Sequence, residues 1–397
     1  MRRRSAEAAP SGPPKASLLY HPRLRSIVYQ LVLLAVLVWL GVEFALNAKA
    51  NLDAQKVASG FGFLGNTAGF GVNQSLIPYD ETSSYGRVFL VGLLNTLLVS
   101  GLGIVLATVL GFVVGLARLS PNLLIARIGG GYVELIRNLP LLFQILFWYL
   151  AVLGTLPAPR QSLSLFGVFL SNRGIIFPAP VLGPGSEYVV LAFVAALIAA
   201  LALRWWGRRR QERTGRPFPL LAAAAALIVG LPLVVFLALD APIGLEQPQL
   251  RGFNFVGGIR LIPEFTALLV ALTTYTAAFI AEIVRAGVVA VPRGQSEAAQ
   301  ALGLTRGQML RLVIVPQALR VIVPPLTNQY LNLTKNSSLA VAIGYPDLFA
   351  LFAGTTLNQT GQAIETIAIT MAVYLALSLV TSGLMNWYNA RLRLKER

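Results

Sequence analysis

Long apolar runs recur along this chain and constrain its fold more than any other feature. The first run covers residues 27–46 and carries a single charged side chain, Glu43, near its end. A helix of about 20 residues crosses the ~30 Å hydrocarbon core of a bilayer. Runs of this kind predict membrane spans at 27–46, 88–116, 134–155, 188–204, 219–239, 264–288, 318–343 and 364–387. The sequence therefore predicts an all-α polytopic membrane protein with about eight transmembrane helices.

The low charge content supports this interpretation. Only 12% of the residues are charged, whereas soluble domains carry about 25%. The tripeptide Ala48-Lys49-Ala50 resembles a signal-peptide cleavage site, but the apolar core of a signal peptide spans only about 7–15 residues. We therefore expect residues 27–46 to form an uncleaved first helix behind a disordered, basic cytoplasmic tail at 1–26.

Basic residues are distributed unevenly between the predicted loops. With the N-terminus inside, the cytoplasmic segments hold 24 Lys and Arg residues and the outside segments hold 7. Basic loops face the cytoplasm, so we expect an inner-membrane protein with both termini cytoplasmic. A nucleic-acid partner is the weaker interpretation of the net charge of +16. Trp205 and Trp206, beside the arginines of 204–217, fit an interfacial position, with contact to anionic membrane lipids as a minor option.

The residue inventory excludes several chemistries. The chain has no cysteine, and its one histidine, His21, lies in the tail. Disulfides, thiolate catalysis, Cys-based or His-rich metal sites and a Ser-His-Asp triad in the membrane domain are therefore excluded. None of the lysines follows a glycine, so the chain lacks a Gly-Lys-Ser/Thr phosphate-binding loop. We expect no catalytic residue, metal or cofactor here, and energy from ATP has to come from a partner.

A regular two-helix pattern follows the sixth predicted span. Pro292 suits a first helical position, and Gly303 can take the left-handed conformation that ends a short helix. Thr305 and Gln308 then predict a capping box ahead of an apolar run. The sequence therefore predicts a rigid pair of helices in the cytoplasmic loop 289–317.

The same loop resembles the signature of ABC importer permeases. The motif Glu297-Ala298-Ala299 is followed by three residues, Gly303, nine residues and Val313-x-Val315-Pro316. In that family this loop docks into a separate ATPase subunit. The resemblance therefore implies that ATPase coupling rests on Glu297, Ala298, Ala299, Gly303 and Pro316. Glu-Ala-Ala alone is also compatible with a plain alanine-rich loop helix.

Four further motifs extend this resemblance. They are Glu134 to Gln144, Ala281-Glu282-Ile283-Val284-Arg285, Pro316-Gln317-Ala318-Leu319-Arg320 and Pro324 to Gln329. They are similar to the polar amino-acid permease family, which imports His, Glu, Gln, Arg and opines, and most of all to its general L-amino-acid permeases. The chain departs from the family pattern at Asn138, where Gly is usual, and at Asn336, where Asp is common.

The resemblance implies a fold, a division of the chain and a set of partners. The fold is that of a type I ABC importer permease, with a five-helix core and three extra helices. Residues 88–155 and 263–388 are predicted to form the core, and residues 156–262 to add a helix pair with its loops. The implied partners are ABC ATPase subunits, a second, homologous permease chain and a periplasmic amino-acid-binding protein.

Polar residues inside the predicted spans are candidates for a substrate pathway. Lys335 is expected near mid-bilayer in a polar patch with Asn336, Ser337 and Ser338. A structural lysine, paired to a carbonyl or directed to the interface, is an equal alternative. Three weaker candidates, in spans where polar groups more often join helices, are Asn95, Thr96 and Gln144.

Glu282 and Arg285 lie three residues apart near the end of the sixth predicted span. That spacing places both on one helical face, so we expect a structural ion pair that supports the loop, with a substrate contact as the lesser alternative.

The sequence thus predicts a permease subunit that moves polar L-amino acids from periplasm to cytoplasm. A self-contained secondary transporter or channel is the main alternative, but intramembrane carboxylates for coupling ions are scarce. An intramembrane enzyme such as a lipid-modifying transferase is disfavoured, because the chain lacks Cys and has few carboxylates.

Overall fold

Seven helices in the described residues of the computed structural model are long and apolar enough to cross a membrane, and one bent pair makes an eighth crossing if it counts as one span. The structure describes residues 22–54, 60–215, 218–240 and 242–392. Six of the seven are α1 (Pro22–Ala54), α2 (Tyr85–Ala117), α5 (Ser186–Thr214), α6 (Leu220–Ala238), α7 (Pro263–Val289) and α12 (Ala363–Leu392). The seventh runs through α9 (Arg306–Met309), η5 (Leu310–Ile314), α10 (Val315–Asn336) and η6 (Ser337–Ile343). The predicted helical architecture of about eight spans is confirmed.

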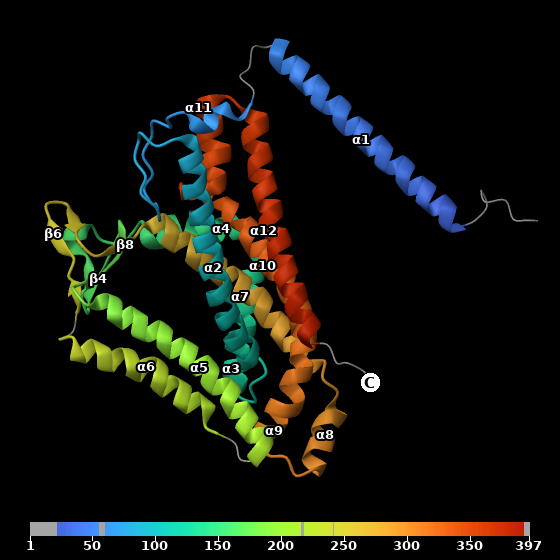
Figure 1. The fold of residues 1–397 in the computed structure, drawn as a ribbon, viewed down its shortest axis with the longest axis vertical. Coiled ribbons are helices and arrows are strands. Elements are labelled where there is room, and N and C mark those ends of the chain that lie inside the picture. The colour runs from blue at the N-terminus through green and yellow to red at the C-terminus, as the bar shows by residue number, and fades with distance from the viewer. Residues whose placement is uncertain (1–21, 55–59, 216–217, 241, 393–397) are drawn as a thin grey trace, which may run out of the picture.

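The first helix is longer than the predicted span 27–46, because helical residues continue beyond the apolar run at both ends. α1 begins at Pro22, inside the predicted tail, and ends at Ala54. The rest of that tail, residues 1–21, lies outside the described residues. None of the apolar stretch of α1 is buried, and Figure 1 shows the helix apart from the bundle.

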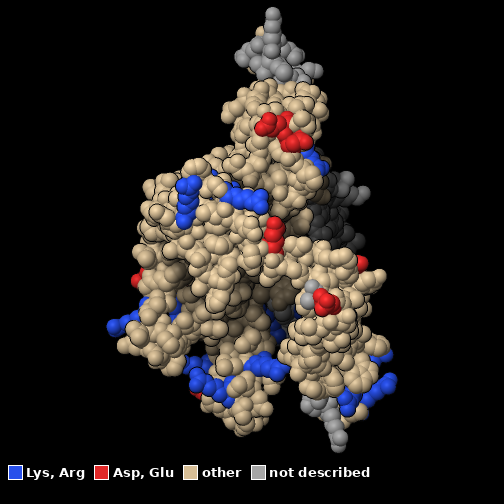
Figure 2. Space-filling view, turned by 90° about the vertical axis from the view of Figure 1, so that its left-hand side faces the viewer, with Lys and Arg blue, Asp and Glu red and all other residues tan. Residues whose placement is uncertain are grey.

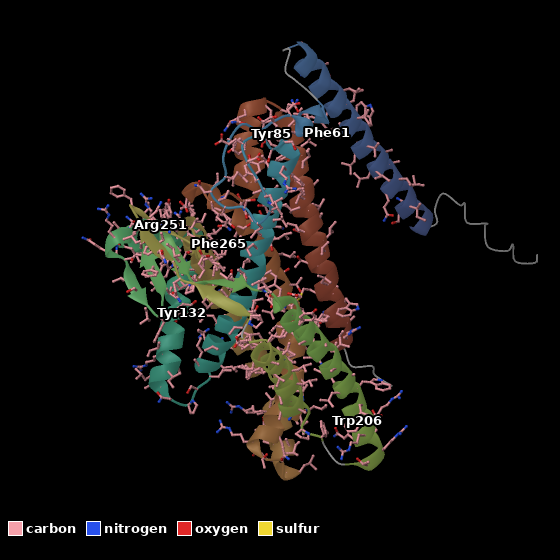
Figure 3. The ribbon with its side chains drawn as sticks, turned by 60° about the vertical axis from the view of Figure 1, so that its left-hand side comes forward. Phe61, Tyr85, Tyr132, Trp206, Arg251 and Phe265 are labelled. Atoms are coloured by element: carbon pink, nitrogen blue, oxygen red, sulfur yellow. The ribbon has the colours of Figure 1, made fainter. Side chains whose placement is uncertain are left out.

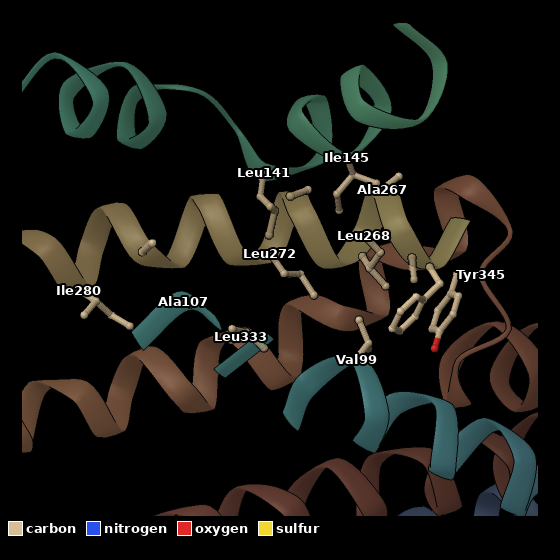
Figure 4. Packing of buried hydrophobic residues seen from close by; sticks show 14 of the residues in the cluster. Val99, Ala107, Leu141, Ile145, Ala267, Leu268, Leu272, Ile280, Leu333 and Tyr345 are labelled. Carbon is tan, nitrogen blue, oxygen red and sulfur yellow. The ribbon is translucent and has the colours of Figure 1, made fainter. Parts of the chain in front are cut away.

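Glycines allow α2 and α7 to pack closely at the centre of the bundle. Gly111 of α2 lies against Ile280, and Gly115 lies against Val284. Small residues let helix backbones approach in a membrane, where packing rather than hydrophobicity drives association. Figure 4 shows the resulting core, in which side chains of α2, α4, α7 and α10 interdigitate, among them Val99, Ala107, Leu141, Ile145, Leu268, Leu272, Ile280 and Leu333.

The third predicted span, 134–155, is not one straight helix. The helical stretch begins earlier, at Leu123, and consists of α3 (Leu123–Asn138), α4 (Leu141–Leu146) and the π-helix η3 (Phe147–Leu153), with a bend of 106° between α3 and α4. Pro140 causes the break, because proline cannot donate the amide hydrogen bond that would continue α3 and it disfavours a helical Leu139. Leu139 is accordingly extended, with φ −98° and ψ 129°.

Short strands occupy the segments on either side of the α5–α6 pair, which the sequence indicated only as loops. The strands are β1 (Leu163–Leu165), β2 (Val168–Ser171), β3 (Gly174–Phe177), β4 (Ala179–Leu182), β5 (Ile243–Glu246), β6 (Gln249–Arg251), β7 (Asn254–Val256) and β8 (Ile259–Leu261). They form an antiparallel sheet in the order β1-β2-β3-β8 and the two pairs β4-β5 and β6-β7. Because β3 and β4 precede the helix pair while β8 and β5 follow it, the strands join both ends of the insertion directly before α7 (Figure 1).

α5 and α6 pack mainly against each other. Contacts between α5 and α6 dominate for both helices, and none of the apolar stretch of α6 is buried. The remaining short elements are η2 (Phe61–Gly65), η4 (Pro159–Gln161), α8 (Arg293–Ala301), η7 (Phe349–Thr356) and α11 (Leu357–Thr360). Figure 1 places α8 and α9 at one end of the molecule and α11 at the other. Lys and Arg side chains gather toward the α8 end of the face seen in Figure 2.

Candidate functional site

The loop between α7 and α10 contains a short helix, α8, with defined ends. Pro292 is its N-cap residue rather than the predicted first helical residue. At the other end Gly303 has a φ of 74°. The Gly303 amide donates to the Gln300 carbonyl at 2.9 Å, and the Leu304 amide donates to the Ala299 carbonyl at 3.1 Å. This pair of bonds is a Schellman motif, so the turn fixes the direction in which α8 points.

A second helical segment follows the turn and leads into the bundle. The Gln308 amide donates to Thr305 Oγ1, and the Thr305 amide donates to Gln308 Oε1 at 2.9 Å, which completes the capping box. The π-helical turn η5 directly precedes α10 and Pro316, which has no amide hydrogen for the preceding turn. Gln317 Nε2 of α10 donates to Gln295 Oε1 of α8 at 3.1 Å. This hydrogen bond joins α8 to α10, and the segment from α8 to the start of α10 is the braced unit discussed below.

The residues expected to mediate coupling lie on two sides of this unit. Glu297, Ala298 and Gly303 are exposed, whereas Ala299 is only 3% exposed and packs inward. Leu302, which the motif did not single out, is 81% exposed at the turn. Ala298 and Leu302 are therefore both accessible to another protein at this end of the molecule.

Two arginines meet Glu282 just before this loop. Arg285 Nη2 donates to Glu282 Oε1 at 2.6 Å, so the residues expected to pair lie in contact. Arg118 Nη1 also donates to Glu282 Oε2. Arg118 is the C-cap residue of α2, and no local pattern indicated its role, because it lies 164 positions before Glu282 along the chain. The cluster ties α2 to the end of α7.

The polar patch around Lys335 is only partly directed at one cavity. Lys335 is exposed, and Ser338 donates its hydroxyl to the Lys335 carbonyl at 2.8 Å. Ser337 is buried and bonds the Thr334 carbonyl of its own helix at 2.8 Å, and Asn336 is half-buried. The cavity has a volume of about 450 Å³ and is lined by Lys335, Ser338, Phe349, Ala353, Ile367, Thr370, Met371 and Tyr374.

The three weaker pathway candidates hold backbone groups in place. Asn95 Nδ2 donates to the Gln74 and Pro346 carbonyls, both at 2.9 Å. Thr96 Oγ1 accepts from the Leu348 amide at 3.0 Å. Gln144 Nε2 donates to the carbonyls of Ile136 and Leu139, both at 3.0 Å, and so caps the broken end of α3. None of the three is a lining residue of the cavity.

A buried carboxylate beside the cavity was missed from the sequence. Asp347 Oδ1 accepts from the Ala350 amide at 2.8 Å, and Tyr374, which lines the cavity, donates its hydroxyl to Asp347 Oδ2 at 3.3 Å. An Asp before an apolar helix is an N-cap signal, which was available in Pro346-Asp347. Within the residues that the structure describes, no group of three or more His, Cys, Asp or Glu side chains could hold a metal ion.

A bundle of membrane spans with an exposed helical turn at one end agrees with the arrangement expected of an ABC importer permease subunit. The model of the family described as binding-protein-dependent transport system inner membrane component matches residues 192–394. The chain belongs to this family.

Three relatives align over nearly the whole chain. YhdX of Escherichia coli (strain K12) is 54% identical over 385 residues, covering 96% of this chain and 98% of that protein. The general L-amino acid transport system permease protein AapQ of Rhizobium johnstonii is 52% identical, with coverages of 96% and 95%. The glutamate/glutamine/aspartate/asparagine transport system permease protein BztB of Rhodobacter capsulatus is 45% identical, with coverages of 98% and 100%. The resemblance to the polar amino-acid permeases is confirmed.

The protein is therefore a multi-pass membrane protein and the permease subunit of a bacterial ABC importer. ATP hydrolysis belongs to a separate subunit, so the chain is not itself the enzyme of the complex. ATPase subunits and a binding protein are its partners.

Proposed function

We propose that this permease carries polar L-amino acids from the periplasm to the cytoplasm. Two of its relatives support the substrate class by the transport systems to which they belong, general L-amino acids for AapQ and four acidic or amide amino acids for BztB. Both align over almost their full length, including the cavity region, so the same class of solute suits this chain.

The single observation that carries the mechanism is the braced end of α8. Gly303 fixes the turn, and the contact between Gln295 and Gln317 ties α8 to α10. A rigid element that presents Ala298 and Leu302 outward transmits a displacement instead of absorbing it. When the ATPase subunits close on ATP, α8 moves with the subunit that holds it, and α10 follows.

Glu282 extends this linkage into the bundle. It lies on α7, directly before the loop, and its contact with Arg118 joins α7 to the end of α2. A displacement of α8 is therefore passed to both central helices, and the bundle alternates between outward- and inward-facing states.

The substrate passes beside Lys335. The cavity of about 450 Å³ that Lys335 and Ser338 line falls within the size range of small-molecule sites, about 300–1,000 Å³. Lys335 is expected near mid-bilayer, where an ammonium group is costly unless it has a partner. The carboxylate of an amino acid supplies one. Asn336 contributes a neutral polar group beside it.

Both termini and α8 lie in the cytoplasm in this proposal. The excess of Lys and Arg in these segments supports that orientation. The chain works beside a second, homologous permease, because two ATPase subunits that close on each other need two coupling loops. A periplasmic binding protein delivers the amino acid to the permease.

Reconstitution tests this function directly. The complete complex in proteoliposomes, with binding protein outside, is expected to take up radiolabelled L-glutamate, L-glutamine, L-aspartate and L-asparagine only when ATP is supplied to the ATPase subunits. ATP-dependent uptake of a solute that is not an amino acid, with no polar L-amino acid transported, would refute the proposed substrate class.

A further inference from the structure

A groove between α5 and α6 lies outside the permease core. It has a volume of about 480 Å³ and is lined by Ala199, Ala202, Leu203, Trp205, Trp206 and Leu227. Both helices qualify as membrane spans. A pocket with an apolar lining at this depth suits a hydrocarbon chain better than a water-soluble ligand.

Aromatic and basic side chains close one end of the groove. The Cζ atom of Arg209 lies 3.8 Å from the centre of the Trp205 ring, and that of Arg210 lies 5.4 Å from the Trp206 ring. Phe218 meets Trp206 edge-on, with ring centres 5.5 Å apart. These cation–π and ring contacts hold both tryptophans between the apolar groove and the guanidinium groups.

Among the described residues, no ion pair joins the guanidinium groups at this end to a carboxylate. Both ion pairs in the described part of the chain involve Glu282 on α7. The described arginine side chains at this end are Arg204, Arg209, Arg210 and Arg213. Glu212 is the one described carboxylate in this stretch and makes no ion pair with these arginines, so this end of the groove carries a net positive charge.

This end of the groove lies on the side of the molecule that carries α8 and α9. Figure 3 places Trp206 at the opposite end of the molecule from Tyr85, and Figure 1 shows the same end of α5 at the level of α8 and α9. Gly207 is buried, and a Cβ added there would meet Leu220 Cδ2 at 2.6 Å. The helices thus close on each other just past the tryptophans. Because tryptophans are enriched at membrane interfaces, we expect this end of the groove to lie near the lipid headgroups.

We propose that this α5–α6 groove binds one anionic phospholipid, with an acyl chain between Ala202 and Leu227 and the phosphate against Arg209 and Arg210. Guanidinium groups match phosphate oxygens in a planar, bidentate geometry. A zwitterionic headgroup brings its own cation toward the arginines, so the site selects phosphatidylglycerol over phosphatidylcholine. Lipid binding would then be the role of the extra α5–α6 pair. This role does not depend on which solute the core transports.

The test compares lipids and matched variants in the complete importer complex. The purified, delipidated complex is titrated with phosphatidylglycerol or phosphatidylcholine of the same acyl chains, and native mass spectrometry counts lipids retained by this chain. Arg391 is the matched control for Arg209, because its Cζ atom also lies 3.8 Å from a tryptophan ring, that of Trp387 on α12. Ala202→Trp fills the groove while every arginine stays in place.

We expect Arg209→Gln to weaken retention of the tightest-bound phosphatidylglycerol about fivefold, because the variant loses one surface cation. Arg391→Gln should leave this retention unchanged. Ala202→Trp displaces the same lipid. Equal losses in the two arginine variants, equal retention of both lipids by the unmodified chain, or full retention in Ala202→Trp would each overturn the proposal. If Ala202→Trp prevents assembly, the two arginine variants and the two lipids still decide.

Discussion

Glu282 of α7 accepts hydrogen bonds from Arg118, the C-cap residue of α2, and from Arg285, one turn further along α7. The aliphatic part of Arg118 also lies beneath α3, because a Cβ added at Gly129 would come 3.0 Å from Arg118 Cγ. The Arg118 side chain therefore joins α2 to α7 by its ionic contact and to α3 by packing, near the point where the chain leaves the bundle for α8.

Replacing Arg118 with glutamine should loosen this junction. Hydrogen bonds to charged groups contribute about 1.5–3 kcal/mol, and partial exposure of Glu282 reduces the effect, so we expect a loss of about 1–2 kcal/mol in unfolding free energy. Thermal unfolding of the detergent-solubilised complex measures it. A double-mutant cycle with Glu282→Gln is the control, and strictly additive losses would show that the contact contributes nothing.

Close packing of α2 on α7 makes a second prediction. A Cβ on Gly111 would lie 2.6 Å from the Cβ of Ile280 and 3.0 Å from the Ala277 carbonyl oxygen, whereas a Cβ on Gly101 of the same helix meets nothing within 4 Å. We expect Gly111→Ala to destabilise the fold by about 1–3 kcal/mol, the usual cost of overpacking, and Gly101→Ala to be neutral or stabilising.

The melting temperatures of these two glycine variants provide the measurement. Equal behaviour of Gly111→Ala and Gly101→Ala would mean that α2 and α7 do not approach as closely as described.

The turn at the end of α8 can be tested in the same paired manner. Gly303 has φ 74°, where any side chain costs about 1–2 kcal/mol, whereas Gly307 has no positive φ. Gly303→Ala should therefore shift α8 out of its braced position and lower ATP-driven uptake, with Gly307→Ala close to unchanged. Uptake by proteoliposomes and the amount of ATPase that co-purifies are the readouts. A Gly303→Ala complex with normal uptake would remove the turn from the mechanism.

Lys335 supplies a prediction about the substrate. Lys335→Met removes the ammonium group beside the cavity, and we expect the KM for amino-acid uptake to rise about tenfold or more, the loss of one charge-assisted hydrogen bond. Lys335→Arg retains a cation and should recover part of the affinity. Unchanged uptake by the methionine variant, in a complex that assembles normally, would assign Lys335 a structural role.

Local patterns in the sequence were sufficient for the helices and for α8. Apolar runs determine membrane spans regardless of their neighbours, and the Schellman turn at Gly303 and the capping box at Thr305 depend only on residues within one turn. Pro140 carried the signal for the bend in the third span, but the continuous apolar composition around it outweighed that signal.

Long-range contacts were not predictable from one sequence. β3 pairs with β8 across the whole α5–α6 insertion, and each strand has only three or four residues, too few for a clear alternating pattern. The contact between Arg118 and Glu282 depends on how α2 and α7 pack. Gln144 and Thr96 are polar residues in apolar surroundings, and only the fold shows that they bond backbone groups.

We propose that the ATPase subunit holds this permease by α8, and the absence of cysteine from this chain permits a direct test. Ala298→Cys places one thiol on the exposed side of α8, and Phe166→Cys places one on the turn between β1 and β2, where Phe166 is 93% exposed. With a bifunctional thiol-reactive cross-linker and the complete complex, we predict that Ala298→Cys forms a covalent product with the ATPase subunit and that Phe166→Cys does not. A product from Phe166→Cys with none from Ala298→Cys would contradict the account.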